Sequence, residues 1–66
     1  MQPHELKKLR ETHGVSQTEL ADFLGYSVNG KPNRSMIARF ENGYAKINTR
    51  LSKLINLYFE EKDGNI

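Results

Sequence analysis

The chain has 66 residues, no cysteine and a formal net charge of +2, which allows one domain without disulfides or thiolate metal sites. A domain of this size buries only about 60% of the surface of its unfolded chain, so it has little room for a deep active site. No apolar run approaches the roughly 18 residues of a membrane-spanning helix, and the start, MQPHELKKLR, lacks the apolar segment of a signal peptide. We therefore expect one cytoplasmic domain over residues 1–66, without a membrane partner.

The charges are unevenly distributed along the chain. Between residues 25 and 53 there are six basic residues and one acidic residue, Glu41, whereas the remainder carries four basic and seven acidic residues. A basic middle between acidic flanks is typical of a surface that binds a polyanion.

Four helices are predicted, over residues 3–13, 16–24, 33–41 and 49–61, with a loop over 25–32 and a tail over 62–66. Pro3 suits the first position of a helix. Ser16 and Glu19 have the spacing of a capping box, and Gly25 favours termination of the second helix. Asn33 is a suitable N-cap for the third helix, and Asn48 or Thr49 for the fourth.

Each helix after the first has an apolar face at helical spacing. The expected inward residues are Leu20, Ala21 and Leu24 with Phe23 beside them, then Ile37 and Phe40, then Leu51, Leu54, Ile55 and Tyr58. Three further apolar residues are surplus to these faces and mark a candidate homodimer surface: Leu57, Phe59 and Ile66. The alternative is that one or two of them fold back onto the first helix.

Two short helices joined across a glycine, with the small Ala21 where they approach, have the pattern of a helix-turn-helix. The segment GVSQTELADFLG, followed by RSMIARFENG, resembles the lambda-repressor/Cro-like family, also called the xenobiotic-response-element type. The resemblance extends from about Glu5 to Tyr58. It implies an all-α, compact domain of four or five helices that binds operator DNA, usually as a dimer.

The sequence departs from that family in the turn. Gly25 and Ile37 are twelve positions apart, about twice the separation that is usual in the family. The extra residues lie within 26–32, where Asn29-Gly30 is a turn signal. This extended loop is either a solvent-exposed excursion or a finger that contacts the DNA backbone through Lys31.

The candidate DNA contacts fall into two groups. Arg34 and Ser35 begin the proposed recognition helix and are expected to reach base edges, where an Arg can pair with guanine; Arg39 is expected to read a base or to hold the backbone. The resemblance assigns phosphate contact to Gln17, Asn42 and Gly43, the last two of which also fit a simple helix C-cap. The other candidate phosphate ligands are Lys31, Asn33, Lys46, Arg50 and Lys53.

Arg10 and Glu41 are expected to form a structural ion pair, because Arg10 lies on the inward face of the first helix and the family often pairs an Arg and a Glu at these places. His4 and His13 have no matching carboxylates, so we expect no metal site. No catalytic arrangement, cofactor motif or effector-binding domain is visible.

The sequence therefore predicts a DNA-binding transcriptional regulator that is not an enzyme, a repressor that binds a palindromic site in double-stranded DNA as a homodimer. Phage regulation, control of restriction-modification and antitoxin function all fit such a protein. The alternative is a protein-interaction module, or an antitoxin-like partner, that uses the same fold to contact another protein.

Overall fold

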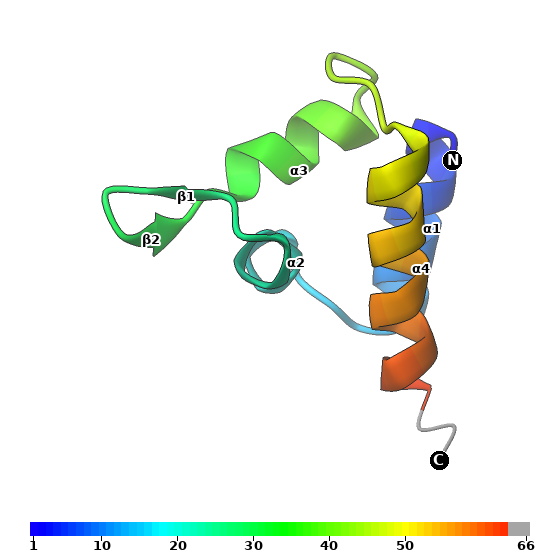
Figure 1. Ribbon diagram of the computed structural model, residues 1–66. Coiled ribbons are helices and arrows are strands. Elements are labelled where there is room, and N and C mark those ends of the chain that lie inside the picture. Colours follow the sequence, from blue (N-terminus) through cyan, green and yellow to red (C-terminus); the bar gives the residue numbers. More distant parts are fainter. Residues whose placement is uncertain (64–66) are drawn as a thin grey trace.

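The computed structural model describes residues 1–63 as four helices and one short β-hairpin (Figure 1). The elements follow in the order α1 (Pro3–Thr12), α2 (Gln17–Leu24), β1 (Ser27–Val28), β2 (Lys31–Pro32), α3 (Arg34–Glu41) and α4 (Thr49–Lys62). The four predicted helices are therefore present, with ends within one residue or so of the expected ones. The hairpin between α2 and α3 was not expected.

In α2 and α4 the side chain of the N-cap residue accepts an N–H of the first turn. The Ser16 hydroxyl accepts the Glu19 N–H at 3.0 Å, which is one of the two hydrogen bonds of the expected capping box. The Asn48 side chain accepts the Leu51 N–H at 2.8 Å and so decides between the two expected caps of α4. Asn33 occupies the expected N-cap position of α3, but its side chain makes no cap hydrogen bond. Its ψ of 85° lies well short of the extended values at Ser16 and Asn48.

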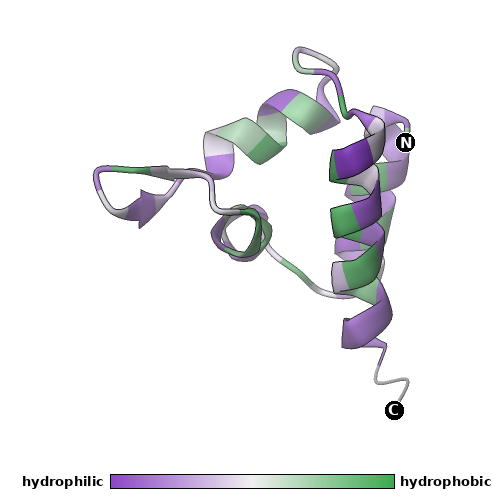
Figure 2. Cartoon of the chain, viewed as in Figure 1, coloured by the Kyte–Doolittle hydropathy of each residue, from purple (hydrophilic) through white to green (hydrophobic). Residues whose placement is uncertain are grey.

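All four helices contribute to one apolar core. Its members within the helices are Leu6, Leu20, Ala21, Ile37, Phe40, Leu51, Ile55 and Phe59, and Val15 and Ile47 join it from the connections. Ala21 is fully buried, and the absence of a larger side chain there allows α2 to pack closely on α3. Figure 2 shows the apolar colour concentrated on the sides of the helices that face one another. The expected inward positions of α3, Ile37 and Phe40, are confirmed.

The buried face of α4 differs from the expected one. Phe59, expected at a homodimer surface, is only 2% exposed, because its ring packs against the His13 ring with centroids 4.9 Å apart. Leu54, expected in the core, is 43% exposed, and Phe23 of α2 is exposed to the same extent. Phe23 stacks on Tyr58 at 4.4 Å. Leu57 is 50% exposed, as a surface role requires, and Ile66 lies outside the described residues.

His13 joins the end of α1 to the end of α4. One ring nitrogen lies 2.8 Å from the Leu9 carbonyl and the other 2.7 Å from the Asp63 carboxylate. The hydrogen bond to Leu9, followed by the one to Asp63, raises the pKa of His13 above its ordinary value of 6.5. A base at the C-terminal end of α1 also interacts favourably with the helix dipole.

The segment 26–32 is an antiparallel hairpin that projects away from the helices (Figure 1). Ser27 pairs with Pro32 and Val28 with Lys31. Asn29 and Gly30 form the tip with φ of 53° and 78°, the positive values that a two-residue hairpin turn requires. At the base, the Asn33 N–H donates to the Tyr26 carbonyl at 2.9 Å. The turn signal was therefore correct, but the irregular loop expected around it was not.

Candidate nucleic-acid interface

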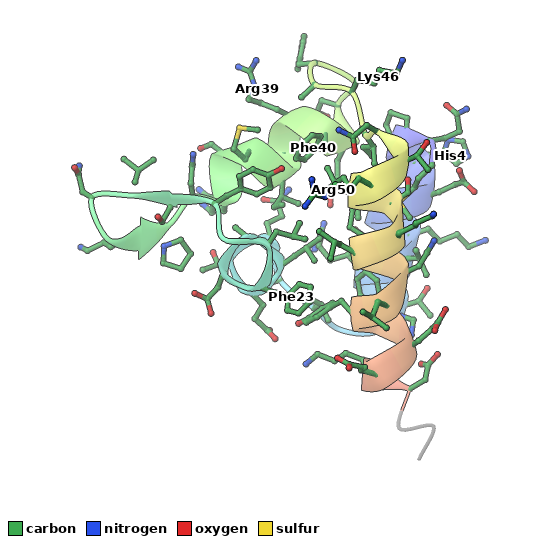
Figure 3. The ribbon with its side chains drawn as sticks, in the orientation of Figure 1. His4, Phe23, Arg39, Phe40, Lys46 and Arg50 are labelled. Atoms are coloured by element: carbon green, nitrogen blue, oxygen red, sulfur yellow. The ribbon has the colours of Figure 1, made fainter. Side chains whose placement is uncertain are left out.

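Helix α3 has one buried and one exposed face. Ile37 is fully buried and Phe40 is 4% exposed, whereas Arg34, Ser35 and Arg39 are all exposed. Ser35 and Arg39 are one helical turn apart and therefore share a face, and Arg34 lies at the N-terminal end beside them. Figure 3 shows Arg39 pointing away from the helices, on the opposite side of α3 from Phe40. The three expected base-reading residues thus all lie on the accessible side of one helix.

A polar groove runs past the N-terminus of α2 and both ends of α3. It is lined by Lys7, Arg10, Ser16, Gln17, Thr18, Arg34, Glu41 and Asn42. The first-turn N–H groups of α2 point toward this end of the helix, where they favour an anion. The groove therefore brings together three residues predicted to contact DNA: Gln17, Arg34 and Asn42.

The expected ion pair between Arg10 and Glu41 is present at the floor of this groove. The Arg10 Nε donates to Glu41 at 2.7 Å and its Nη2 at 3.2 Å. The side chains are only 12% and 5% exposed, respectively. Arg10 also donates to the Val15 carbonyl at 3.1 Å, and the hydrogen bond to Glu41 is the main reason that the pKa of Arg10 is raised. The pair joins α1 to the end of α3 and neutralises the acidic charge beside Arg34.

Gln17 is held by the same carboxylate, since its amide donates to Glu41 at 3.1 Å. A primary amide has two N–H groups, so the second remains available to a ligand in the groove. Gln17 was predicted to contact a DNA phosphate and Glu41 to form an ion pair with Arg10. This hydrogen bond joins the two side chains. Glu41 thereby fixes the side chain of one candidate DNA contact while pairing with Arg10.

The C-terminal end of α3 retains only part of the expected phosphate-binding capacity. The Asn42 N–H donates to the Ala38 carbonyl at 2.9 Å and the Gly43 N–H to the Phe40 carbonyl at 3.3 Å. These backbone groups therefore serve the helix C-cap and do not point freely to solvent. The exposed Asn42 side chain remains available, whereas Gly43 can offer only close approach of its backbone.

Of the other predicted phosphate ligands, Asn33 is half-buried at the base of the hairpin, and the remaining four are exposed but lie outside the groove. Lys31 is on the hairpin, and Lys46 is in the connection after α3, where it lines a depression together with Gly43 and the N-terminal residues. Arg50 and Lys53 belong to α4. Figure 3 shows Arg39 and Lys46 at the same end of the molecule, with Arg50 farther along. The basic residues of the middle segment thus cover several surfaces and do not form one strip.

Three side chains at these surfaces were not singled out from the sequence. Lys7 and Thr18 line the groove, and Lys7 could have been inferred because it lies three residues before Arg10 on the same face of α1. Tyr44 is 77% exposed in the connection after α3. Its hydroxyl is a further hydrogen-bond donor on the exposed surface directly after Asn42-Gly43.

Comparison with protein-family models, with curated proteins and with solved structures finds no match. Within residues 1–63, no helix has both the length and the apolar character needed to cross a membrane. The same part of the chain contains no cluster of three or more His, Cys, Asp or Glu side chains that could hold a metal ion.

Proposed function

We propose that this chain is a sequence-specific DNA-binding regulator of the lambda-repressor/Cro-like type, in which α2 and α3 form the helix-turn-helix. The observation that carries the proposal is the arrangement of α3. This helix buries Ile37 and Phe40 against the other helices and presents Arg34, Ser35 and Arg39 to solvent. Such a helix fits the major groove, where residues near its N-terminus reach the base edges.

The groove beside α3 supports a backbone contact next to the base contacts. Gln17, with its second amide N–H, the N-terminus of α2 and the exposed Lys7 surround one site of anion preference. Asn42 lies at its other end. Because Arg10 neutralises Glu41 at the floor, the carboxylate does not repel a phosphate placed above it. Phosphate contacts on either side of α3 would fix its register in the groove.

The hairpin adds a second arm to this surface. It leaves the chain between α2 and α3 and carries an exposed Lys31, which in this function contacts the DNA backbone beside the recognition helix. Of the two alternatives for the inserted segment, the ordered hairpin favours the backbone-contacting finger. In this function the chain acts as a homodimeric repressor whose half-sites are about 34 Å apart on the duplex.

Selection of bound duplexes from a random pool tests the proposal. An inverted repeat is the expected product, and uniform enrichment without a motif would contradict sequence-specific binding. On the selected duplex, Arg34→Ala is expected to weaken binding by about 1–3 kcal/mol and to relax one base position. Lys8→Ala is the matched control, because Lys8 is an exposed base that lines the opposite groove between α1 and α4.

The dependence of affinity on salt separates this function from the protein-interaction alternative. A complex with about six phosphate contacts loses about 10³ in affinity between 50 and 200 mM salt. A protein partner bound to the same face of α3 would show a much shallower dependence and no preference for any duplex.

A further inference from the structure

The outer face of α4 carries exposed leucines between two ends of opposite charge. Leu54 is 43% and Leu57 50% exposed. Arg50 lies one turn before this pair and Glu61 one turn after it, and both are exposed. Figure 2 shows apolar colour in the middle turns of α4 and hydrophilic colour at its ends. We call these four residues the α4 seam.

The spacing of the α4 seam matches that of a coiled coil. Positions 50, 54, 57 and 61 are separated by four, three and four residues, which is the alternation of a and d positions along one helix. The core residues Leu51, Ile55 and Phe59 follow a different line of the same helix. The α4 seam is therefore a second apolar face, which the fold of one chain leaves uncovered.

The charges of the α4 seam are complementary to those of its own reversed copy. In an antiparallel pair of α4 helices centred between Leu54 and Leu57, each of these leucines lies opposite the other in the partner. The same register places Arg50 opposite the partner's Glu61. Within one chain, Arg50 and Glu61 are about 16 Å apart along the helix at 1.5 Å per residue, so the two ion pairs lie at opposite ends of the contact. Beside the seam, Lys53 comes close to the partner's Glu60 in this register.

The charged residues of the seam are free to make these contacts. The ion pairs within residues 1–63 join Arg10 to Glu41, His13 to Asp63 and Lys62 to Glu19. Neither Arg50 nor Glu61 takes part in them. A parallel pair would instead place like charges opposite each other at both ends, so the order of charges selects the antiparallel arrangement.

We infer that two copies of this chain associate through an isologous, antiparallel contact of their α4 seams. The contact follows the two-fold symmetry of most homodimers, and it assigns the dimer surface to Arg50, Leu54, Leu57 and Glu61 in place of Phe59. It rests on the proposed function only for its use at an inverted repeat. In that use Arg50 serves the protein contact and not a DNA phosphate.

The size of this contact predicts a weak dimer. One helix from each protomer forms an interface at the small end of specific complexes, below about 1,200 Å², and we expect dissociation in the micromolar range. The exposed Phe23, whose ring contacts that of Tyr58 one turn after Leu54, adds apolar surface at one edge.

Sedimentation of the full chain without DNA, over about 5 to 500 µM, tests the inference across the expected dissociation range. Wild type is expected to shift from monomer to dimer, and Leu57→Lys to remain monomeric. Arg50→Glu brings two acids together at each end of its own dimer and Glu61→Arg brings two bases together. Each single variant is expected to dimerise roughly tenfold more weakly, since two surface ion pairs become repulsive. Lys8→Glu, on the exposed side of α1, is the control and should dimerise like wild type.

Mixing the two single variants gives the decisive result. In the mixed dimer, acid again meets base at both ends, so the mixture is expected to regain wild-type association, as is the double variant Arg50→Glu/Glu61→Arg. Monomeric wild type at every concentration, or a mixture no more dimeric than its parts, would overturn the inference. Circular dichroism confirms that each variant is folded. Because no DNA is present, failure of the duplex selection would not alter these outcomes.

Discussion

Replacing Arg10 with Met removes one partner of the buried ion pair and leaves the other in place. Glu41 is 5% exposed, and after the substitution it keeps only the hydrogen bond from Gln17, at 3.1 Å. Stranding one member of a buried pair typically costs about 3–5 kcal/mol. We expect the lower end, about 3 kcal/mol, because Gln17 remains and the groove is open to water on one side.

Urea unfolding at about pH 7 measures this loss. A loss of about 3 kcal/mol corresponds to a melting temperature lower by about 20 °C in a domain of this size. Lys8→Met controls for loss of a positive charge on the same helix. A loss below about 1 kcal/mol would mean that water already solvates the pair.

Three further predictions follow from the site and the helix ends. Because the pKa of His13 is raised in the folded chain, its contribution to stability is complete below about pH 6.5 and is lost as pH rises through the raised value. Urea unfolding midpoints measured between about pH 5 and 8 should show this loss of stability, and Asp63→Asn should make it smaller. Asn48→Ala is expected to cost about 1 kcal/mol of unfolding free energy, and Asn33→Ala much less, since only the first caps a helix; equal losses would contradict this. Arg34→Ala is expected to reduce affinity for a selected duplex in fluorescence anisotropy without changing the melting temperature, because its side chain is exposed.

Helix positions were predictable because local chemistry marks the ends. Pro3, the hydroxyl of Ser16 and the left-handed Gly25 act within a few residues of themselves, so no knowledge of the fold is needed to interpret them. Asn33 shows the limit of this reasoning. The residue type suits a cap, but the preceding hairpin holds its backbone at a ψ that differs from those of the two capping residues.

The buried face of α4 could not be chosen from periodicity. Apolar residues cover so wide an arc of this helix that several inward faces are consistent with the pattern. The choice depends on the neighbouring elements. The His13 ring covers Phe59, whereas Phe23 of α2 contacts Tyr58 and leaves Leu54 exposed. In the groove, the ion pair was predictable from the family pattern, whereas the bond from Gln17 to Glu41 depends on how closely α2 approaches the end of α3.

The closed base of the hairpin makes the inserted segment a module that the domain can vary independently. The bond between Asn33 and Tyr26 joins the two ends of the insertion, while the Tyr26 ring stays beside Phe40 at 5.8 Å. Lengthening the tip changes loop-closure entropy only slowly, by about 0.6 kcal/mol for each doubling, and leaves the packing of α2 on α3 unchanged. New sequence at Asn29-Gly30 would thus change the exposed surface of the hairpin without rebuilding the helices behind it, so this tip can vary at little cost to folding.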